Sequence, residues 1–291
     1  MKSPSEPRPA QAAAEPTEWA RPWRLEATRR LLLAARGLEF FSLAIPRPDD
    51  LIGSAHRFYA KPEVVTGMAE SADADLYPHE KAALERFAPH PTDALVLGCG
   101  AGREAIALVK RGWSVVGLDA GPALIEAAKL NAARADVRID FRCHDITRPF
   151  HVDVDRVFDL VCIFGVVYSL IPSRPLRVAT LRTCRTHLAP DGVCVLDFAA
   201  RENPTSPREL WAHRWRQRLA WATRGNRDCQ IGDHWFAGVL CMHAFAHPDE
   251  VSKEAEEAGF HTEMLRDPGY PPVAVLTHRP HPHEMSSRDA D

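Results

Sequence analysis

The pattern of hydrophobic and polar residues changes period part-way along the chain. In the first part, apolar residues such as Leu31 and Leu38 recur at helical spacing and predict a helix over residues 19–45. A second helix is predicted over 78–88, where a proline stands in the first turn. The stretch between these two helices is expected to be less regular. We therefore expect a helical cap over residues 19–90.

Beyond the cap, short apolar runs alternate with segments of helical spacing. The runs lie at residues 94–97, 113–118, 137–141, 157–164, 193–198, 261–265 and 273–277. A continuous apolar run is typical of a strand that is covered on both faces, as in a parallel sheet. The alternation predicts an α/β fold with a doubly wound, seven-stranded, mostly parallel sheet, in which one antiparallel strand lies near the C-terminal end.

Length and composition bound the organisation of the chain. The 291 residues suggest two domains at roughly 150 residues each, but the strand pattern accounts for a single sheet. Both ends are rich in proline and charge and are expected to be disordered. We expect this division: a tail over 1–18, the cap over 19–90, a sheet domain over 91–279 with an insertion at 201–247, and a tail over 280–291.

Charge and apolar content exclude several classes of protein. There are 36 lysines and arginines against 39 aspartates and glutamates, a net charge of −3, which disfavours a dedicated nucleic-acid binder. No run approaches the roughly 18 apolar residues of a membrane span, so no membrane partner is expected. The N-terminus has no apolar signal segment, and the seven cysteines form no CxxC pair. Together these features predict a cytoplasmic chain with reduced thiols and no metal site.

A glycine-rich turn follows the first predicted strand. The sequence LVLGCGAG ends at Gly102, and its glycines allow a ligand to approach the backbone at the N-terminus of the next helix. Asp119 closes the second strand, about 20 residues on, where an acid can accept hydrogen bonds from ribose hydroxyls. A dinucleotide fingerprint requires its third glycine at the position of Arg103. The turn therefore predicts a nucleoside-containing ligand other than a typical dinucleotide.

Five segments in series carry a family resemblance. LVLGCGAG is followed by GLDAG, HDI, FDLVCIFGVVYSL and LAPDGVCVLDF, over about residues 93–200. In this series the chain resembles the class I S-adenosylmethionine-dependent methyltransferases. The resemblance implies a Rossmann-like fold, S-adenosylmethionine as cofactor, and transfer of its methyl group by in-line displacement to a small-molecule acceptor. The atom that receives the methyl group, whether O, N, C or S, stays open, as does the oligomeric state.

The resemblance also implies which residues contact the cofactor. Asp119 would hold the ribose hydroxyls and Asp145 the adenine amino group. The full set implied is Gly98, Cys99, Gly100, Ala101, Gly102, Leu118, Asp119, Ala120, Asp145, Ile146, Phe164 and Gly165. The chain departs from the family at Val96, where many members have an acid. A polar contact near the cofactor's amino group is thereby left unassigned, and Arg57, Tyr59, Tyr77 or a water could supply it.

The acceptor needs a general base only if it is protonated at neutral pH. By position, the candidates are Tyr168, just past the fourth strand, and His243, in the extended segment before the last helix. Both are also candidates for acceptor binding. Two other functions stay open: a catalytically silent cofactor-binding subunit and a nicotinamide-dependent oxidoreductase. Arg103 and the motif at Asp145 disfavour the oxidoreductase.

The insertion over 201–247 is rich in tryptophan and arginine. Seven arginines stand against two glutamates between residues 201 and 227, and Trp211 and Trp215 lie one turn apart on a predicted helix. They could form a lid over the pocket of an acidic or phosphorylated acceptor. They could equally be the buried face of a helix that packs on the sheet. Single-stranded nucleic acid stacked on the indoles is a third reading, which the acidic net charge disfavours.

Overall fold

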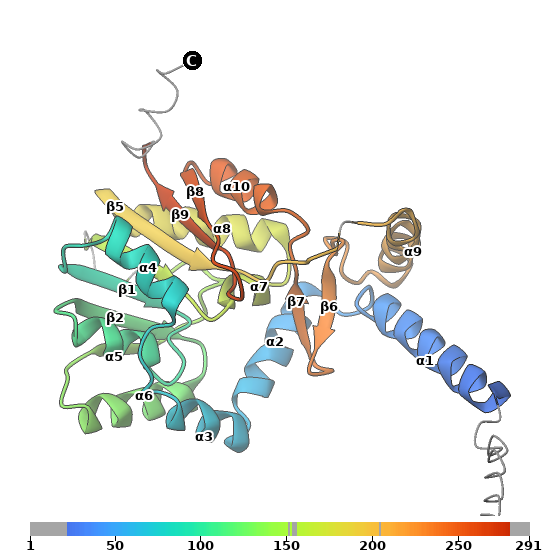
Figure 1. The fold of residues 1–291 in the computed structure, drawn as a ribbon, viewed down its shortest axis with the longest axis horizontal. Helices are drawn as coiled ribbons and strands as arrows, with labels where there is room; N and C mark the ends of the chain where they lie inside the picture. Colours follow the sequence, from blue (N-terminus) through green and yellow to red (C-terminus); the bar gives the residue numbers. More distant parts are fainter. Residues whose placement is uncertain (1–21, 151, 153–155, 204, 280–291) are drawn as a thin grey trace, which may run out of the picture. The chain divides into compact units, whose positions relative to one another are not determined.

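A computed structural model describes residues 22–150, 152, 156–203 and 205–279 (Figure 1). The predicted tails, 1–18 and 280–291, lie outside these residues. The chain divides into two compact units between Glu39 and Phe40. The division falls inside α1 (Pro22–Ser42), which matches the first predicted helix. The second unit holds every other element.

The second unit contains the predicted seven-stranded sheet. Its strands are β1 (Asp93–Leu97), β2 (Ser114–Asp119), β3 (Asp140–Cys143), β4 (Phe158–Ile163), β5 (Leu188–Asp197), β8 (His261–Leu265) and β9 (Val273–Thr277). They lie in the order β3-β2-β1-β4-β5-β9-β8, and β9 alone runs antiparallel to the other six strands. The predicted fold class is confirmed. Because the chain winds outward from β1 in both directions, the carboxyl ends of β1 and β4 meet at the switch point.

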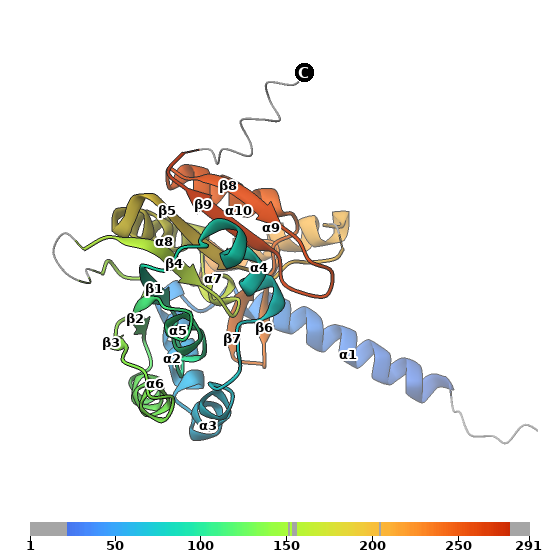
Figure 2. The same ribbon diagram turned by 60° about the vertical axis from the view of Figure 1, so that its left-hand side comes forward.

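Helices cover both faces of this sheet. They are α4 (Pro78–Phe87), α5 (Arg103–Val109), α6 (Pro122–Arg134), the short α7 (Val167–Leu170), α8 (Arg174–His187) and α10 (Pro248–Glu257). Alternate strand residues face opposite cores: Leu95 and Leu97 pack with α8 and α10, whereas Ala94 and Val96 pack with α4, α5 and α6 (Figures 1 and 2). This double covering explains why the strand runs are continuously apolar.

Two further helices occupy the stretch that was expected to be irregular. They are α2 (Pro48–Tyr59) and α3 (Pro62–Glu70), so that expectation was wrong. Each begins with a proline in its first turn and carries one internal glycine, Gly53 or Gly67, which weakens the helical signal. Packing supplies the missing stability, since Leu51 and Ile52 of α2 are buried.

The insertion forms a helix and a hairpin. These are α9 (Pro207–Thr223), followed by β6 (Asp233–Phe236) and β7 (Leu240–His243), which pair antiparallel. The helix matches the prediction and β7 lies in the segment expected to be extended, but β6 was not foreseen. The hairpin packs against α2, where Ser54 Oγ donates to the Val239 carbonyl at 2.8 Å. No helix in the described part of the chain is long and apolar enough to cross a membrane.

A buried charged network joins α7, α8 and α10. The Arg177 guanidinium, fully buried, donates to both carboxylate oxygens of Glu254 at 2.9 and 2.7 Å and to Gln230 Oε1 at 2.6 Å. The Tyr168 hydroxyl donates to the same carboxylate at 2.6 Å. Burial, together with this carboxylate, raises the pKa of Tyr168 well above its usual value. The phenol therefore stays protonated and serves as a donor.

We predict that Arg177→Ala lowers the free energy of unfolding by about 3–5 kcal/mol, because the buried Glu254 carboxylate keeps only the more distant Arg174 guanidinium, at 4.0 Å. Arg182→Ala on the same helix is the matched control. Arg182 is exposed and pairs with Glu257 at the surface, so its loss should cost about 0–1 kcal/mol. Urea unfolding of the two variants measures the difference, and equal losses would contradict a structural role for the network.

Candidate active site

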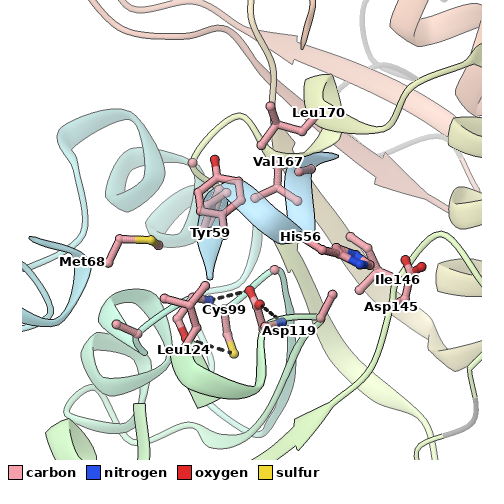
Figure 3. A pocket seen from close by; sticks show the side chains of 18 of the residues that line it. His56, Tyr59, Met68, Cys99, Asp119, Leu124, Asp145, Ile146, Val167 and Leu170 are labelled. Atoms are coloured by element: carbon pink, nitrogen blue, oxygen red, sulfur yellow. Dashed lines mark hydrogen bonds between the residues drawn. The ribbon is translucent and has the colours of Figure 1, made fainter. Parts of the chain in front are cut away.

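A cavity of about 230 Å³ opens at the carboxyl ends of β1, β2 and β4. Its floor is the loop that follows each of these strands, and its roof is formed by α2, α3 and the segment around α7 (Figure 3). Ligands of open α/β sheets bind at such strand ends. The cap predicted from the sequence therefore contributes directly to the site through α2 and α3.

The glycine-rich loop after β1 is joined to the end of β2 and lies close to α3 in the roof. The amides of Gly98 and Cys99 both donate to the Leu118 carbonyl, at 2.8 and 3.0 Å. Gly100 has φ +50°, and a Cβ there would lie 2.6 Å from the terminal methyl of Met68 in α3. A side chain at this position is thus opposed by the backbone conformation, and it would also displace the flexible end of Met68.

Asp119 links the loops after β1 and β2. Its carboxylate accepts from the Gly100 amide at 2.9 Å and from the Gly121 amide at 2.8 Å (Figure 3). Burial raises the pKa of Asp119, and the two amide donors oppose the rise. The carboxylate lines the cavity, so its remaining acceptor capacity faces that space. This arrangement suits a pair of hydroxyl donors.

The loop after β3 contributes a second acid. Asp145 Oδ1 accepts from the amide and the hydroxyl of Thr147, at 2.9 and 2.7 Å. This turn fixes the carboxylate, while Ile146 adds an apolar side chain next to it on the cavity wall. Figure 3 places His56 of α2 beside these two residues. The wall there can receive a flat ring with an amino group.

A third charged cluster lies at the start of α5. Arg103 donates to both oxygens of Glu80, at 3.0 and 2.7 Å, and to Glu104 at 2.5 Å, and its guanidinium lies 4.2 Å from the Tyr77 ring. Burial raises the pKa of Glu104 to about 7, Arg103 opposes the rise, and Glu80 adds to it. Arg103, Glu104 and Tyr77 line the cavity, next to Gly165. Two carboxylates thus share one guanidinium.

The roof is mainly apolar. Ile52 and Tyr59 of α2, Met68 of α3, and Val167 and Leu170 of α7 face the cavity (Figure 3). Burial raises the pKa of Tyr59, and the nearby Asp119 charge raises it further. Of these residues only Tyr59 was singled out from the sequence. The spacing of Ile52, His56 and Tyr59, four and three residues apart, could have identified this face of α2.

Most of the residues expected to contact a cofactor line this one cavity. They are Tyr77, Gly98, Cys99, Gly100, Ala101, Asp119, Ala120, Asp145, Ile146, Phe164 and Gly165. Gly102 and Leu118 lie outside the lining. Gly102, with φ +96°, packs against α6, where a Cβ would come within 3.3 Å of Ala128. Leu118 is buried in the core and shapes the floor through its carbonyl.

The residues expected to act on the acceptor lie elsewhere. Tyr168 is fully buried in the network with Glu254, on the side of α7 that faces away from the cavity. His243 is also buried, with its Nδ1 2.7 Å from Asp233 Oδ1 and its Nε2 3.9 Å from Glu250. Burial opposes a charge on His243, but the hydrogen bond to Asp233 and the nearby Glu250 carboxylate outweigh that effect and raise its pKa. Both residues hold elements of the fold together.

Trp211 and Trp215 likewise do not line the cavity. Their side chains are 63 % and 46 % exposed on α9, and their rings contact each other edge to face at 5.9 Å. Figures 1 and 2 both place α9 away from α3 and α6, which border the cavity. In this structure the pair is therefore neither a lid over the cavity nor the buried face of a helix.

One group of three possible metal ligands occurs among the described residues: His79, Glu80 and Asp197. Each acid already has strong donors. Glu80 accepts two bonds from Arg103, and Asp197 accepts from the Val166 amide at 2.6 Å and lies 3.3 Å from His79 Nε2. Asp197 thus fixes the loop after β4, which carries Gly165 into the cavity.

Comparison with known proteins agrees with this geometry. Residues 94–192 match the family described as "Methyltransferase domain". Residues 94–192 thus form a methyltransferase domain. The expected resemblance and fold are confirmed for this domain.

Similar proteins include two ubiquinone biosynthesis O-methyltransferases. That of Psychrobacter arcticus is 30 % identical over 62 % of this chain and 63 % of its own length. That of Bradyrhizobium diazoefficiens is 28 % identical over 55 % of this chain and 54 % of its own length. The chain thus spans between half and two thirds of these relatives. A solved S-adenosylmethionine-dependent methyltransferase of Bacteroides fragilis, in complex with S-adenosylhomocysteine, has a TM-score of 0.51 at 18 % identity, over 72 % of this chain and 80 % of that one.

We predict that Asp119→Ala weakens S-adenosylhomocysteine binding by about 1.5–3 kcal/mol, because charge-assisted hydrogen bonds to the ribose are lost. Isothermal titration calorimetry measures the change. Asp159→Ala, which removes an exposed carboxylate at the start of β4, is the control and should bind as the wild type does. Unchanged affinity in a folded Asp119 variant would place the ribose elsewhere.

Proposed function

We propose that this protein transfers a methyl group from S-adenosylmethionine to a small-molecule acceptor held under α2 and α7. The observation that carries the proposal is the continuity of the cavity. Acids suited to a nucleoside form its floor, and apolar side chains roof the same space. A cofactor on the floor would therefore have an acceptor chamber directly above it. The name "methyltransferase" shared by the relatives supports this reading.

The cofactor's nucleoside fits the floor. Asp119 would accept hydrogen bonds from the ribose hydroxyls, and Asp145 from the adenine amino group. Ile146 would pack against the adenine ring. The backbone of Gly98–Ala101 lies between these acids and the cluster around Arg103, where the amino-acid end would follow. Gly102 and Leu118 would act indirectly, by shaping this loop.

The amino-acid end of the cofactor is a zwitterion, and the cluster at the start of α5 is complementary to it. Arg103 would attract the cofactor's carboxylate, and Glu104 its ammonium group. When both acids are ionised, Glu80 and Glu104 together carry one negative charge more than Arg103, and an ammonium group would neutralise it. Glu104 would thus supply the contact that Val96, buried in the core, cannot make.

The bound cofactor supplies an activated methyl group on a sulfonium. The chain needs to align the acceptor at about 3 Å and exclude water. Val167, Leu170 and Met68 would exclude water, and the Tyr59 hydroxyl is placed to orient the acceptor's polar group (Figure 3). The apolar roof favours an acceptor with an aromatic or aliphatic body. Because the relatives are named O-methyltransferases, we propose an oxygen nucleophile.

Ligand titration separates this proposal from the alternatives. We expect S-adenosylhomocysteine to bind the purified chain and NADH not to bind. Incubation with methyl-labelled S-adenosylmethionine and a panel of phenols and catechols should then yield labelled product. Binding of NADH alone would favour the oxidoreductase. Binding of S-adenosylhomocysteine without transfer to any oxygen, nitrogen, carbon or sulfur acceptor would favour the silent subunit.

Glu104→Gln tests the ammonium contact. With a pKa of about 7 in the free protein, Glu104 is ionised above pH 7, and only the ionised form attracts the ammonium group. Affinity for S-adenosylhomocysteine should therefore rise as pH increases through 7, and calorimetry should detect proton release near pH 7. In Glu104→Gln the affinity should fall about tenfold, and both the pH dependence and the proton release should disappear.

The control ligand is 5′-methylthioadenosine, which lacks the amino-acid end. Its affinity should be nearly the same in the wild type and in Glu104→Gln, since neither complex contains the ammonium contact. A similar loss with both ligands would instead indicate that Glu104 supports the shape of the loop.

A further inference from the structure

The outward side of α9 combines exposed tryptophans with arginines. At 100° per residue, the side chains of Arg208, Leu210, Trp211, Arg214, Trp215, Arg218 and Trp221 fall on one side of this helix. We call this set the α9 outer face. Leu210, Trp211, Trp215 and Trp221 are 48 %, 63 %, 46 % and 65 % exposed, and the three arginines are exposed as well. Solvent-exposed indoles in such a cluster mark an interaction surface.

Contacts on the opposite side of α9 fix the rotation of the helix, so that its tryptophans face solvent. Arg216 is fully buried, donates to the carbonyls of Asp233 at 3.2 Å and of Gln230, and lies 4.3 Å from the Phe40 ring. Ser206 caps the helix through the Glu209 amide. Turning the tryptophans inward would expose or unpair Arg216, so the helix is held with its indoles outward.

The α9 outer face carries positive charge that nearby acids do not neutralise. Arg208, Arg214 and Arg218 have no carboxylate partner in the part of the chain that the structure describes. Arg218 lies over the Trp215 ring at 4.7 Å, and Arg227, just past the helix, lies over Trp221 at 4.0 Å. The only acid of the helix, Glu209, is bound to Arg201 at 2.7 Å on the side of its N-terminus.

We propose that the α9 outer face docks on an anionic lipid membrane surface. Indole rings prefer the boundary between headgroups and acyl chains, where the ring enters the apolar layer and its N–H stays hydrated. Guanidinium groups beside them pair with lipid phosphates, and an anionic leaflet attracts each one. Guanidinium groups over the indoles place both at the same depth, as shallow docking among headgroups requires.

The same features disfavour other occupants. Single-stranded nucleic acid binds in positively charged grooves, whereas this face is the convex side of a helix on a chain with net charge −3. A second copy using the same face would bring arginines against arginines. A helix that binds at the membrane surface needs no membrane-spanning segment. The proposal therefore agrees with the lack of a long apolar run in the sequence, but it replaces the expectation that the protein has no membrane partner. The membrane proposal does not rest on the proposed methyl transfer, because it is tested by vesicle binding alone.

Co-sedimentation of the full chain with vesicles tests the proposal. We expect binding to vesicles of phosphatidylcholine and phosphatidylglycerol in roughly a three-to-one ratio, little binding to phosphatidylcholine alone, and weaker binding as salt rises. Tryptophan fluorescence should shift to the blue on binding. Failure to bind the anionic vesicles, or equal binding to both kinds, would overturn the proposal.

Paired variants locate the surface. Arg214→Ala/Arg218→Ala should lower the partition coefficient about 30-fold. Arg138→Ala/Lys253→Ala removes the same charge from exposed positions elsewhere and should retain binding within about twofold. Trp211→Ala/Trp215→Ala should lower partitioning about tenfold and leave the melting temperature unchanged, because both side chains are exposed.

Three further results would count against membrane docking. Vesicle binding that persists unchanged in both α9 variants would place the contact elsewhere on the chain. Binding of oligothymidylate through these tryptophans, without vesicle binding, would make the face a nucleic-acid surface. Self-association that the Trp211→Ala/Trp215→Ala variant abolishes, again without vesicle binding, would make it an interface between copies.

Discussion

The constraint on which the rest of this structure depends is that a parallel sheet must be covered on both faces. Each strand therefore presents apolar side chains alternately to two helical layers, as Leu95 and Val96 do. With both faces covered, the carboxyl ends of the strands are where the sheet can meet a ligand. The loops after β1, β2, β3 and β4 converge there, and the chemistry of the protein lies in them.

Within that cavity, position decides the task of each acid. Asp119 is tied to two amides and turned toward the space, which suits hydroxyl donors. Asp197, at the end of β5, uses its oxygens on backbone amides and so shapes a loop. Glu104 shares a guanidinium with Glu80, and burial leaves its charge unstable without a further cation. The oxygens of these three acids thus face different surroundings: the cavity for Asp119, backbone amides for Asp197 and a shared guanidinium for Glu104.

The buried arginines show how interior charges shape the surface. Arg177 joins α8 to α10 and engages Tyr168 through their common carboxylate, which removes that phenol from the cavity. Arg216 orients α9 in a similar way, because pairing its guanidinium with the carbonyls of Gln230 and Asp233 turns the tryptophans to solvent. An arginine that reads as surface charge in a sequence can therefore be the side chain that orients a whole helix.

The sequence alone determined the seven-stranded sheet, the alternation of its strands with helices along the chain, and the floor of the site. These depend on local signals: continuous apolar runs, a glycine turn and acids placed directly after strands, so that most of the expected cofactor contacts line one cavity. Only the tertiary structure decided the roof, the environments of Tyr168 and His243, and the direction of Trp211 and Trp215. These depend on pairing between segments distant in the chain, such as Tyr168 with Glu254 and His243 with Asp233. The spacing of residues along one helix carries no information about which distant partner will claim a side chain.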